Sequence, residues 1–298
     1  MIIGHQKQWQ FLRKSLELGK RAHAYLFSGE TQLGKKKFAL EFAKLINGEN
    51  FDFGHPDLIL IEPPTKNLVG GREIQIIQIR ELIQKLSLKP YSAFLKVAMI
   101  DQAHLMNSEA QNCFLKTLEE PKGNTILILI TEAPETLFPT IRSRCEIIKF
   151  YPVKISEIEN YLKSQGISKE KSKAIAKLSL GRPGLAIDFL TNPQKLENQK
   201  KIIEELIKIS SGKTSLSLRF QYAKDLVMNP ELSEILNIWL SYFRTLLLEQ
   251  FLPPEVKKPE YSFSKLKNII KQIQNTNFLI STKNINPRLA LEILMLEL

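Results

Sequence analysis

Short apolar segments, each the length of a buried β-strand, recur through the first half of this chain. They lie at residues 24–28, 57–61, 95–100, 125–131 and 146–150. Helical patterns lie between them, at about residues 35–46, 72–86 and 107–118. Continuous apolar strands that alternate with helices are typical of a parallel sheet covered by helices on both faces. The first half is therefore predicted to be an α/β domain.

The strand signals stop after Tyr151 and Pro152, and the apolar spacing becomes helical. Two short helices are expected at residues 155–165 and 168–178, and residues 251–263, with three prolines, are expected to form a loop. A last helix is expected to begin at Pro287, because proline suits the first turn of a helix. We predict three domains, at residues 1–151, 152–192 and 193–298.

Composition excludes several classes of protein. The 298 residues are 43% hydrophobic and 24% charged, which excludes a disordered chain. The longest apolar run, residues 126–130, is far shorter than the ~20 residues of a membrane span, and no secretory signal is visible. Cys113 and Cys145 form no CxxC pair, so neither a disulfide scaffold nor a zinc site is expected. We therefore expect a cytoplasmic protein.

The net charge of +11 favours a polyanionic partner, although it is equally compatible with a merely soluble surface.

A phosphate-binding pattern follows the first predicted strand. Gly29, Gly34 and Lys35 match the GxxxxGK of a P-loop, whose backbone N–H groups and helix N-terminus hold phosphates. The full pattern continues with a serine or threonine that binds magnesium, and here Lys36 takes that place. Lysine has no lone pair to offer a metal at neutral pH. The segment is either a degenerate nucleotide site or a turn that only keeps the shape.

A second nucleotide signal is also incomplete. Asp101 ends the predicted strand at residues 95–100, as the acidic residue of a P-loop ATPase would. A hydrolytic enzyme of this type needs a glutamate next, to activate the attacking water, and Gln102 cannot accept a proton. Asp101 therefore has either a residual metal role or a structural one. Both replacements predict a chain without its own ATPase activity.

Four segments resemble the bacterial clamp-loader AAA+ ATPase family. They are HAYLFSG at residues 23–29, NSEAQNCFLKTLEEP at 107–121, LFPTIRSRC at 137–145 and NPRLALE at 286–292. The triplet Ser143-Arg144-Cys145 is the most specific element. Because the segments occur from one end of the chain to the other, the resemblance spans nearly all of it. It implies a P-loop AAA+ domain, a small helical lid and a helical collar domain, within the boundaries given above.

Departures from the family pattern narrow the resemblance. The family's motor subunit keeps an intact P-loop, an Asp-Glu pair, a four-cysteine zinc module and an arginine on the lid helix. Here Lys36 and Gln102 break the first two, the segment at residues 47–55 is short and lacks the cysteines, and Gly184 replaces the arginine, with Arg182 nearby. These losses resemble the delta-prime class of DNA polymerase III subunit.

The resemblance implies a role for Arg144. An arginine finger, presented across a subunit interface, stabilises charge on the phosphoryl group at a neighbour's ATP site. Ser143 is then expected to shape the turn and Cys145 to anchor it in the core. The alternative is a surface arginine that pairs with Glu146 or Glu132.

The resemblance also implies partners and cofactors. The expected partners are tau/gamma-like motor subunits and a delta-like subunit, with the sliding clamp and primer-template DNA reached through the complex, and no membrane. The chain itself is expected to have no independent enzymatic activity, since another subunit of the DNA polymerase holoenzyme carries the nucleotidyltransferase activity. Two states of the degenerate nucleotide site are compatible with the resemblance. The site either holds ATP or ADP without hydrolysis, through Gly29, Gly34, Lys35 and Asp101, or it stays empty. Zinc is not expected.

The sequence also offers candidate residues for the collar contact and leaves two alternative functions open. Candidate collar residues are the last helix and the apolar series Leu236, Leu240, Phe243 and Leu247, although ordinary core is the alternative for that series. One alternative function is an autonomous AAA+ motor in which Thr31 or a water replaces the missing hydroxyl. Another is a plain DNA-binding module with a relic P-loop.

Overall fold

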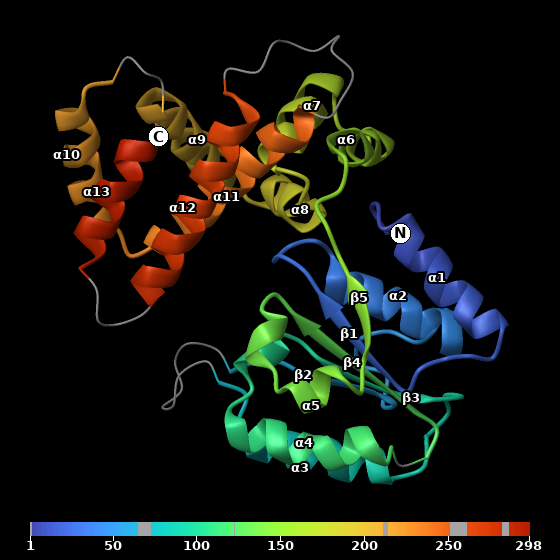
Figure 1. The fold of residues 1–298 in the computed structure, drawn as a ribbon. Coiled ribbons are helices and arrows are strands. Elements are labelled where there is room, and N and C mark those ends of the chain that lie inside the picture. Colours follow the sequence, from blue (N-terminus) through green and yellow to red (C-terminus); the bar gives the residue numbers. More distant parts are fainter. Residues whose placement is uncertain (1, 65–72, 122, 211–213, 251–260, 282–285) are drawn as a thin grey trace. The chain divides into compact units, whose positions relative to one another are not determined.

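The computed structural model describes residues 2–64, 73–121, 123–210, 214–250, 261–281 and 286–298 (Figure 1). The chain forms two compact units. The first comprises Met1–Ser168 with Gly181–Leu185, and the second comprises Lys169–Leu180 with Ala186–Leu298. The division into three domains that the sequence suggests stays a prediction.

A parallel sheet forms the centre of the first unit. Its strands are β1 (Ala24–Ser28), β2 (Leu58–Ile61), β3 (Lys96–Ile100), β4 (Thr125–Thr131) and β5 (Glu146–Lys149). They are ordered β2-β3-β4-β1-β5, and every neighbouring pair is parallel. All five predicted strands are therefore present, and the boundaries differ from the prediction by one residue at most.

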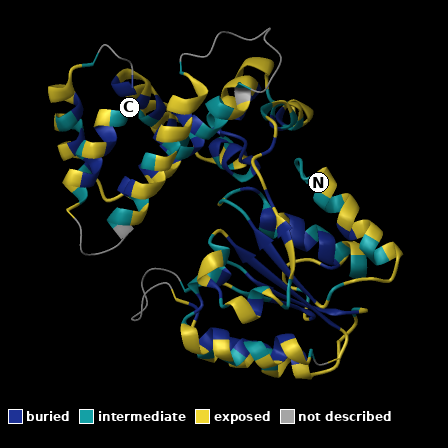
Figure 2. Ribbon diagram, viewed as in Figure 1, coloured by how far each residue is buried: buried dark blue, intermediate teal, exposed yellow. Residues whose placement is uncertain are grey.

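Helices cover both faces of this sheet. The first unit contains α1 (Gln6–Glu17), α2 (Lys35–Asn47), α3 (Ile76–Ser87), α4 (Ser108–Glu119), α5 (Pro139–Arg142) and α6 (Ile155–Ser164). Phe27 of β1 packs with residues of α1 and α2 in one core cluster, and its neighbour Leu26 packs with residues of α3 and α4 in another. Successive side chains of a strand point to opposite faces, so both faces are buried, as the strand colours in Figure 2 show. The predicted α/β fold class is confirmed.

Three helices of the first unit differ from the sequence-based expectation, and one of them is the four-residue α5, for which no helix was predicted. The helix expected at residues 72–86 spans Ile76–Ser87, and Arg72 lies outside the described residues. The helix α1 was not predicted. Only Leu12 of α1 is fully buried, while Trp9 and Leu16 are partly buried against the core, which leaves a weak apolar pattern in the sequence.

The second unit is helical. Its elements are α7 (Lys169–Leu178), most of α8 (Pro183–Thr191), α9 (Pro193–Ser210), α10 (Leu216–Val227), α11 (Leu232–Glu249), α12 (Phe263–Ser281) and α13 (Pro287–Glu297). The last helix begins at Pro287, as predicted. Residues 251–260 of the expected loop lie outside the described residues. Across the described ranges, no helix is long and apolar enough to cross a membrane.

The apolar series of α11 belongs to the core of the second unit. Leu236 and Phe243 are fully buried beside Trp239, and Leu240 and Leu247 are partly buried against the same cluster. This agrees with the ordinary-core alternative for the series and leaves little of it for contact with another subunit.

Asp57 fixes the loop that leads from α3 to β3. Its side chain is buried, and its two carboxylate oxygens accept hydrogen bonds from the backbone N–H groups of Tyr91, Ser92 and Ala93 at 2.7, 2.9 and 2.9 Å. Burial alone would raise the pKa of Asp57, but these three donors outweigh it and hold the pKa below its ordinary value. Residue 57 was expected to be the first residue of a strand, and it instead links the start of β2 to this loop.

We expect Asp57→Ala to lower the free energy of unfolding by about 2–4 kcal/mol, because three backbone N–H groups lose their acceptor. Asp57→Asn, which keeps one acceptor, should cost less. A depressed carboxyl pKa stabilises the fold above the unfolded-state pKa, about 3.9, and that stability is lost as the pH falls through the folded-state pKa. Urea unfolding followed by circular dichroism should therefore show a constant difference between wild type and Asp57→Asn from pH 7 to pH 5, which shrinks below about pH 4. A difference that grows with acid would contradict this assignment.

Candidate functional site

The candidate site lies at the edge of the sheet where the strands end. Gly29 directly follows β1, Glu62 follows β2, Asp101 follows β3 and Glu132 follows β4. The carboxyl ends of parallel strands meet at one edge, which is where open α/β sheets bind ligands. Gly29 and Asp101 were predicted as site residues. Glu62 and Glu132 were missed, although their positions directly after a strand are the signal that could have found them.

The loop from β1 to α2 keeps the shape of a phosphate-binding loop. Gly34 has a left-handed conformation and is the N-cap of α2, which begins at Lys35. The first backbone N–H groups of a helix have no partner within the helix and form an anion-binding end. Gly29, Gly34 and Lys35 therefore lie together, as the motif predicts.

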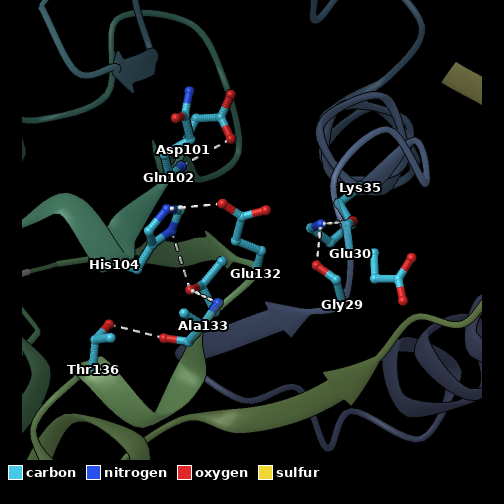
Figure 3. Close-up of polar contacts among 10 residues, drawn as sticks. Gly29, Glu30, Lys35, Asp101, Gln102, His104, Glu132, Ala133 and Thr136 are labelled. Carbon is cyan, nitrogen blue, oxygen red and sulfur yellow. Dashed lines mark hydrogen bonds and ion pairs between the residues drawn. The ribbon is translucent and has the colours of Figure 1, made fainter. Parts of the chain in front are cut away.

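The Lys35 ammonium group is bound to its own loop. It donates hydrogen bonds to the carbonyl oxygens of Gly29, at 2.6 Å, and of Glu30 (Figure 3). The side chain is buried, and burial lowers the pKa of Lys35 to about 8, against the opposing influence of Glu132, Asp101 and Glu30. The ammonium is thus held against the backbone of the loop, and it is charged at neutral pH.

A small polar network lies next to the loop. His104 Nε2 lies 3.4 Å from Glu132 Oε1, and His104 Nδ1 lies 3.4 Å from Thr131 Oγ1 (Figure 3). The hydrogen bond with His104 lowers the pKa of Glu132, and the cations Lys35 and Arg182 lower it further. Glu132 is therefore a carboxylate that interacts electrostatically with Lys35 and Arg182.

The position that should bind magnesium does not fit a divalent cation. The Lys36 ammonium group forms an ion pair with Glu62, and it lies 4.0 Å from Asp101 Oδ2. Burial raises the pKa of Asp101, while Lys36 and the Gln102 N–H, which donates to Asp101 Oδ1 at 2.9 Å, oppose that rise. A cationic side chain thus lies beside the carboxylate, at the position where an intact P-loop has a metal-binding hydroxyl.

Residues 181–185 belong to the same compact unit and contact this loop. The Gly184 N–H donates to the Gln32 carbonyl at 2.8 Å, and Arg182 Nε lies 3.8 Å from Glu30 Oε2. Arg182 is buried. The structure therefore places Arg182 at the site, as the sequence suggested, and places Gly184 against the backbone of the loop.

Arg144 lies away from these residues. Its Nη2 forms an ion pair with Glu119 Oε1 at 2.8 Å, and its Nη1 donates to the Thr140 carbonyl at 3.0 Å. The alternative partners expected from the sequence, Glu146 and Glu132, were wrong, because the end of α4 brings Glu119 to this turn. Arg144 precedes β5, which begins at the register of Tyr25 in β1, so it lies at the sheet edge opposite the phosphate loop.

The flanking residues of the triplet support its turn. Ser143 Oγ donates to the Thr140 carbonyl at 3.1 Å. Cys145 is partly buried against the core, and burial raises the pKa of its thiol to about 12. Within the part of the chain that the structure describes, no group of three or more His, Cys, Asp or Glu side chains could hold a metal ion.

Known proteins resemble this chain. The family described as DNA polymerase III, delta subunit, matches residues 4–154. The DNA polymerase III subunit delta' of Bacillus subtilis is 31% identical over 210 residues, which cover 65% of this chain and 62% of that protein. The DNA polymerase III subunit tau of Bacillus subtilis is 26% identical over 289 residues, which cover 85% of this chain and 50% of that protein.

A solved structure, a DNA polymerase III gamma subunit-related protein of Thermotoga maritima, has a TM-score of 0.46 at 19% identity and covers 96% of this chain and 97% of that chain. The chain thus spans between half and two thirds of the length of the two Bacillus subtilis relatives. The family match covers just over half of the 298 residues and contains the whole sheet. The chain belongs to the DNA polymerase III delta subunit family, the clamp-loader family that its motifs resemble.

Proposed function

We propose that this chain is a non-hydrolysing, delta-prime-like subunit of the DNA polymerase III clamp loader, and that Arg144 serves as an arginine finger for a neighbouring motor subunit. The expected neighbours are a tau/gamma-like motor and a delta-like subunit, and the complex would place the sliding clamp on primer-template DNA. The family membership and the names of the relatives support this role. The net charge of +11 suits work beside a polyanion.

The side chains at the loop support the absence of hydrolysis. Phosphoryl transfer by P-loop enzymes uses a metal ion held by the loop hydroxyl and a group that orients the attacking water. Lys36 carries no lone pair, and its ammonium pairs with Glu62 beside Asp101. Gln102 cannot accept a proton. The loop itself could still hold the phosphates of ATP or ADP through Gly29, Gly34 and Lys35.

The location of Arg144 carries the proposal that it acts in trans. The full length of β1 lies between the level of Arg144 and the phosphate loop, and five residues at about 3.3 Å each span roughly 16 Å. That distance is far beyond hydrogen-bond reach, so Arg144 has no access to phosphates on its own loop. Its side chain is 37% exposed and is held by a surface ion pair with Glu119. Such a pair is weak enough to exchange its carboxylate for phosphate oxygens.

The last helix offers a contact surface to other subunits. One face of α13 is in the core, with Leu291 and Leu294 fully buried. The other face carries Leu289, Ile293 and Leu296, which are 57%, 50% and 57% exposed. A helix with apolar residues on both faces suits burial on both, and we propose this outer face as the collar contact.

Arg144→Ala should lower the rate of ATP hydrolysis roughly 10³-fold or more at the motor site that faces this chain. The reason is that the transition state there loses its guanidinium. In a loader reconstituted with subunits of the same organism, DNA and clamp should then trigger a rapid hydrolysis burst that is smaller by one site per complex. Arg144→Lys should also fail, because an ammonium lacks the bidentate fork.

Two controls make this result specific. Arg13→Ala removes an exposed arginine that pairs with Glu17 on α1, and it should leave the burst unchanged. Glu119→Gln releases Arg144 without removing it and should keep the burst. An undiminished burst in an assembled Arg144→Ala complex would reject the finger. Steady ATP turnover by the purified wild-type chain would instead favour an autonomous motor.

Leu289→Lys with Ile293→Lys should weaken assembly with the other subunits by at least about tenfold, because two charges enter a face that must be desolvated. The matched control is Met228→Lys, since Met228 is 83% exposed in the same unit and lies outside the α13 face. Analytical ultracentrifugation measures assembly, and circular dichroism shows whether each variant is folded. Equal assembly of both folded variants would show that this face is not the contact.

Lys35 should titrate near pH 8, where an ordinary lysine titrates near 10.4. In NMR spectra of lysine labelled at Cε, one resonance should shift with a midpoint near pH 8 and be missing in Lys35→Met. Because the fold lowers this pKa, the unfolded state holds more protons between about pH 8 and 10.4, so Lys35 should make stability rise with pH across that window. A Lys35 resonance that titrates only above pH 10 would show that the ammonium is not buried.

A further inference from the structure

Lys36 is held on three sides at the edge of the sheet. Its ammonium group pairs with the carboxylate of Glu62 and lies 4.0 Å from Asp101 Oδ2. It also lies 5.3 Å from the centre of the Phe53 ring, within the range of a cation–π contact. Its side chain is 35% exposed, and that of Asp101 is 19% exposed. Lys36 is therefore a positioned cation and not a solvated surface lysine.

The two carboxylates around Lys36 come from neighbouring strands. Glu62 follows β2 and Asp101 follows β3, and these strands pair in parallel. Two carboxylates at adjacent strand ends repel one another, and Glu62 contributes to the raised pKa of Asp101. A divalent cation beside such carboxylates would relieve this repulsion. In this chain the ammonium group of Lys36 provides the positive charge.

The segment that holds Phe53 is the short one at residues 47–55. Phe51 is 2% exposed and is part of the core cluster that contains Phe38 and Phe42 of α2. Lys44 of α2 pairs with Asp52 at 3.0 Å. These contacts fix the segment on α2, so that the ring of Phe53 lies beside the ammonium of Lys36.

We propose that the Lys36 ammonium replaces a divalent cation at this site, so that the chain excludes metal and takes any nucleotide without it. The proposal deepens the non-hydrolysing function, because it names the group that removes the metal chemistry. A divalent ion would have to share Asp101 with an ammonium only 4.0 Å away, and the like charges repel. The ammonium has no lone pair with which to bind the ion.

The test compares the affinity for fluorescent ADP in magnesium with that in EDTA. For the wild type, magnesium should leave the affinity unchanged or weaken it. For Lys36→Thr, which supplies the missing hydroxyl, magnesium should tighten binding by about tenfold, a typical coupling between two ligands. Lys37→Met is the matched control, because Lys37 is the next residue of α2 and pairs with Glu41 on an exposed face. It should behave as the wild type does.

If ADP binding is too weak to measure, the binding of manganese alone, detected by electron paramagnetic resonance, tests the proposal. Lys36→Thr and Lys36→Met should each gain a manganese site that the wild type lacks, and adding Asp101→Asn should remove it. The proposal is overturned if magnesium tightens ADP binding to the wild type about tenfold, or if folded Lys36 variants gain no metal response by either method. Neither measurement involves Arg144 or another subunit, so such a failure would leave the proposed arginine-finger role of Arg144 untouched, and the Arg144 variants test that role separately.

Discussion

The common direction of the five strands is the constraint on which the rest of the first unit depends. Because β1, β2, β3 and β4 all end at one edge, the residues that follow them meet there whatever their separation in sequence. The residues that precede β5 are at the opposite edge for the same reason. The sheet thus keeps the phosphate loop and Arg144 apart. Substitutions at the phosphate loop can therefore abolish the function of that edge without disturbing residues at the other edge, such as Arg144.

Charge balance governs the edge where the strands end. The cations Lys35, Lys36 and Arg182 face the carboxylates of Glu30, Glu62, Asp101 and Glu132. A buried charge is costly unless it is paired, so each partly buried cation here requires a nearby carboxylate. A phosphate that enters the loop must compete with the carbonyl oxygens of Gly29 and Glu30 for Lys35, and with the Glu30 carboxylate for Arg182. The cluster is therefore stable without a nucleotide, which agrees with the proposed role, in which this subunit contributes Arg144 from the other edge.

The sequence predicts the buried parts of this fold better than its surface contacts. The strands β1 and β4 match their predicted ends because they are central strands with every residue buried. The helix α1 escaped prediction because it buries a single residue fully. The partner of Arg144 could not be found from sequence neighbours, since Glu119 reaches it only through the packing of α4 against the turn. Glu62 and Glu132 directly follow strands whose ends the sequence predicts correctly, so both could have been recognised from the sequence in the way that Asp101 was.

Packing alone accounts for two glycines at this site, Gly29 of the loop and Gly184 of α8. A Cβ atom on Gly29 would lie 2.5 Å from the carbonyl oxygen of Phe150, and one on Gly184 would lie 2.8 Å from that of Gln32. Both contacts are with backbone atoms, which cannot move aside as a flexible side chain would, so packing excludes larger residues whether or not a nucleotide binds. Positions 36 and 102 are under no such constraint, since both side chains are partly exposed. The glycines of such a fold therefore indicate only the backbone conformation of the site. Whether the site can bind metal and hydrolyse ATP is indicated by the residues at positions 36 and 102, because packing does not restrict the side chains there.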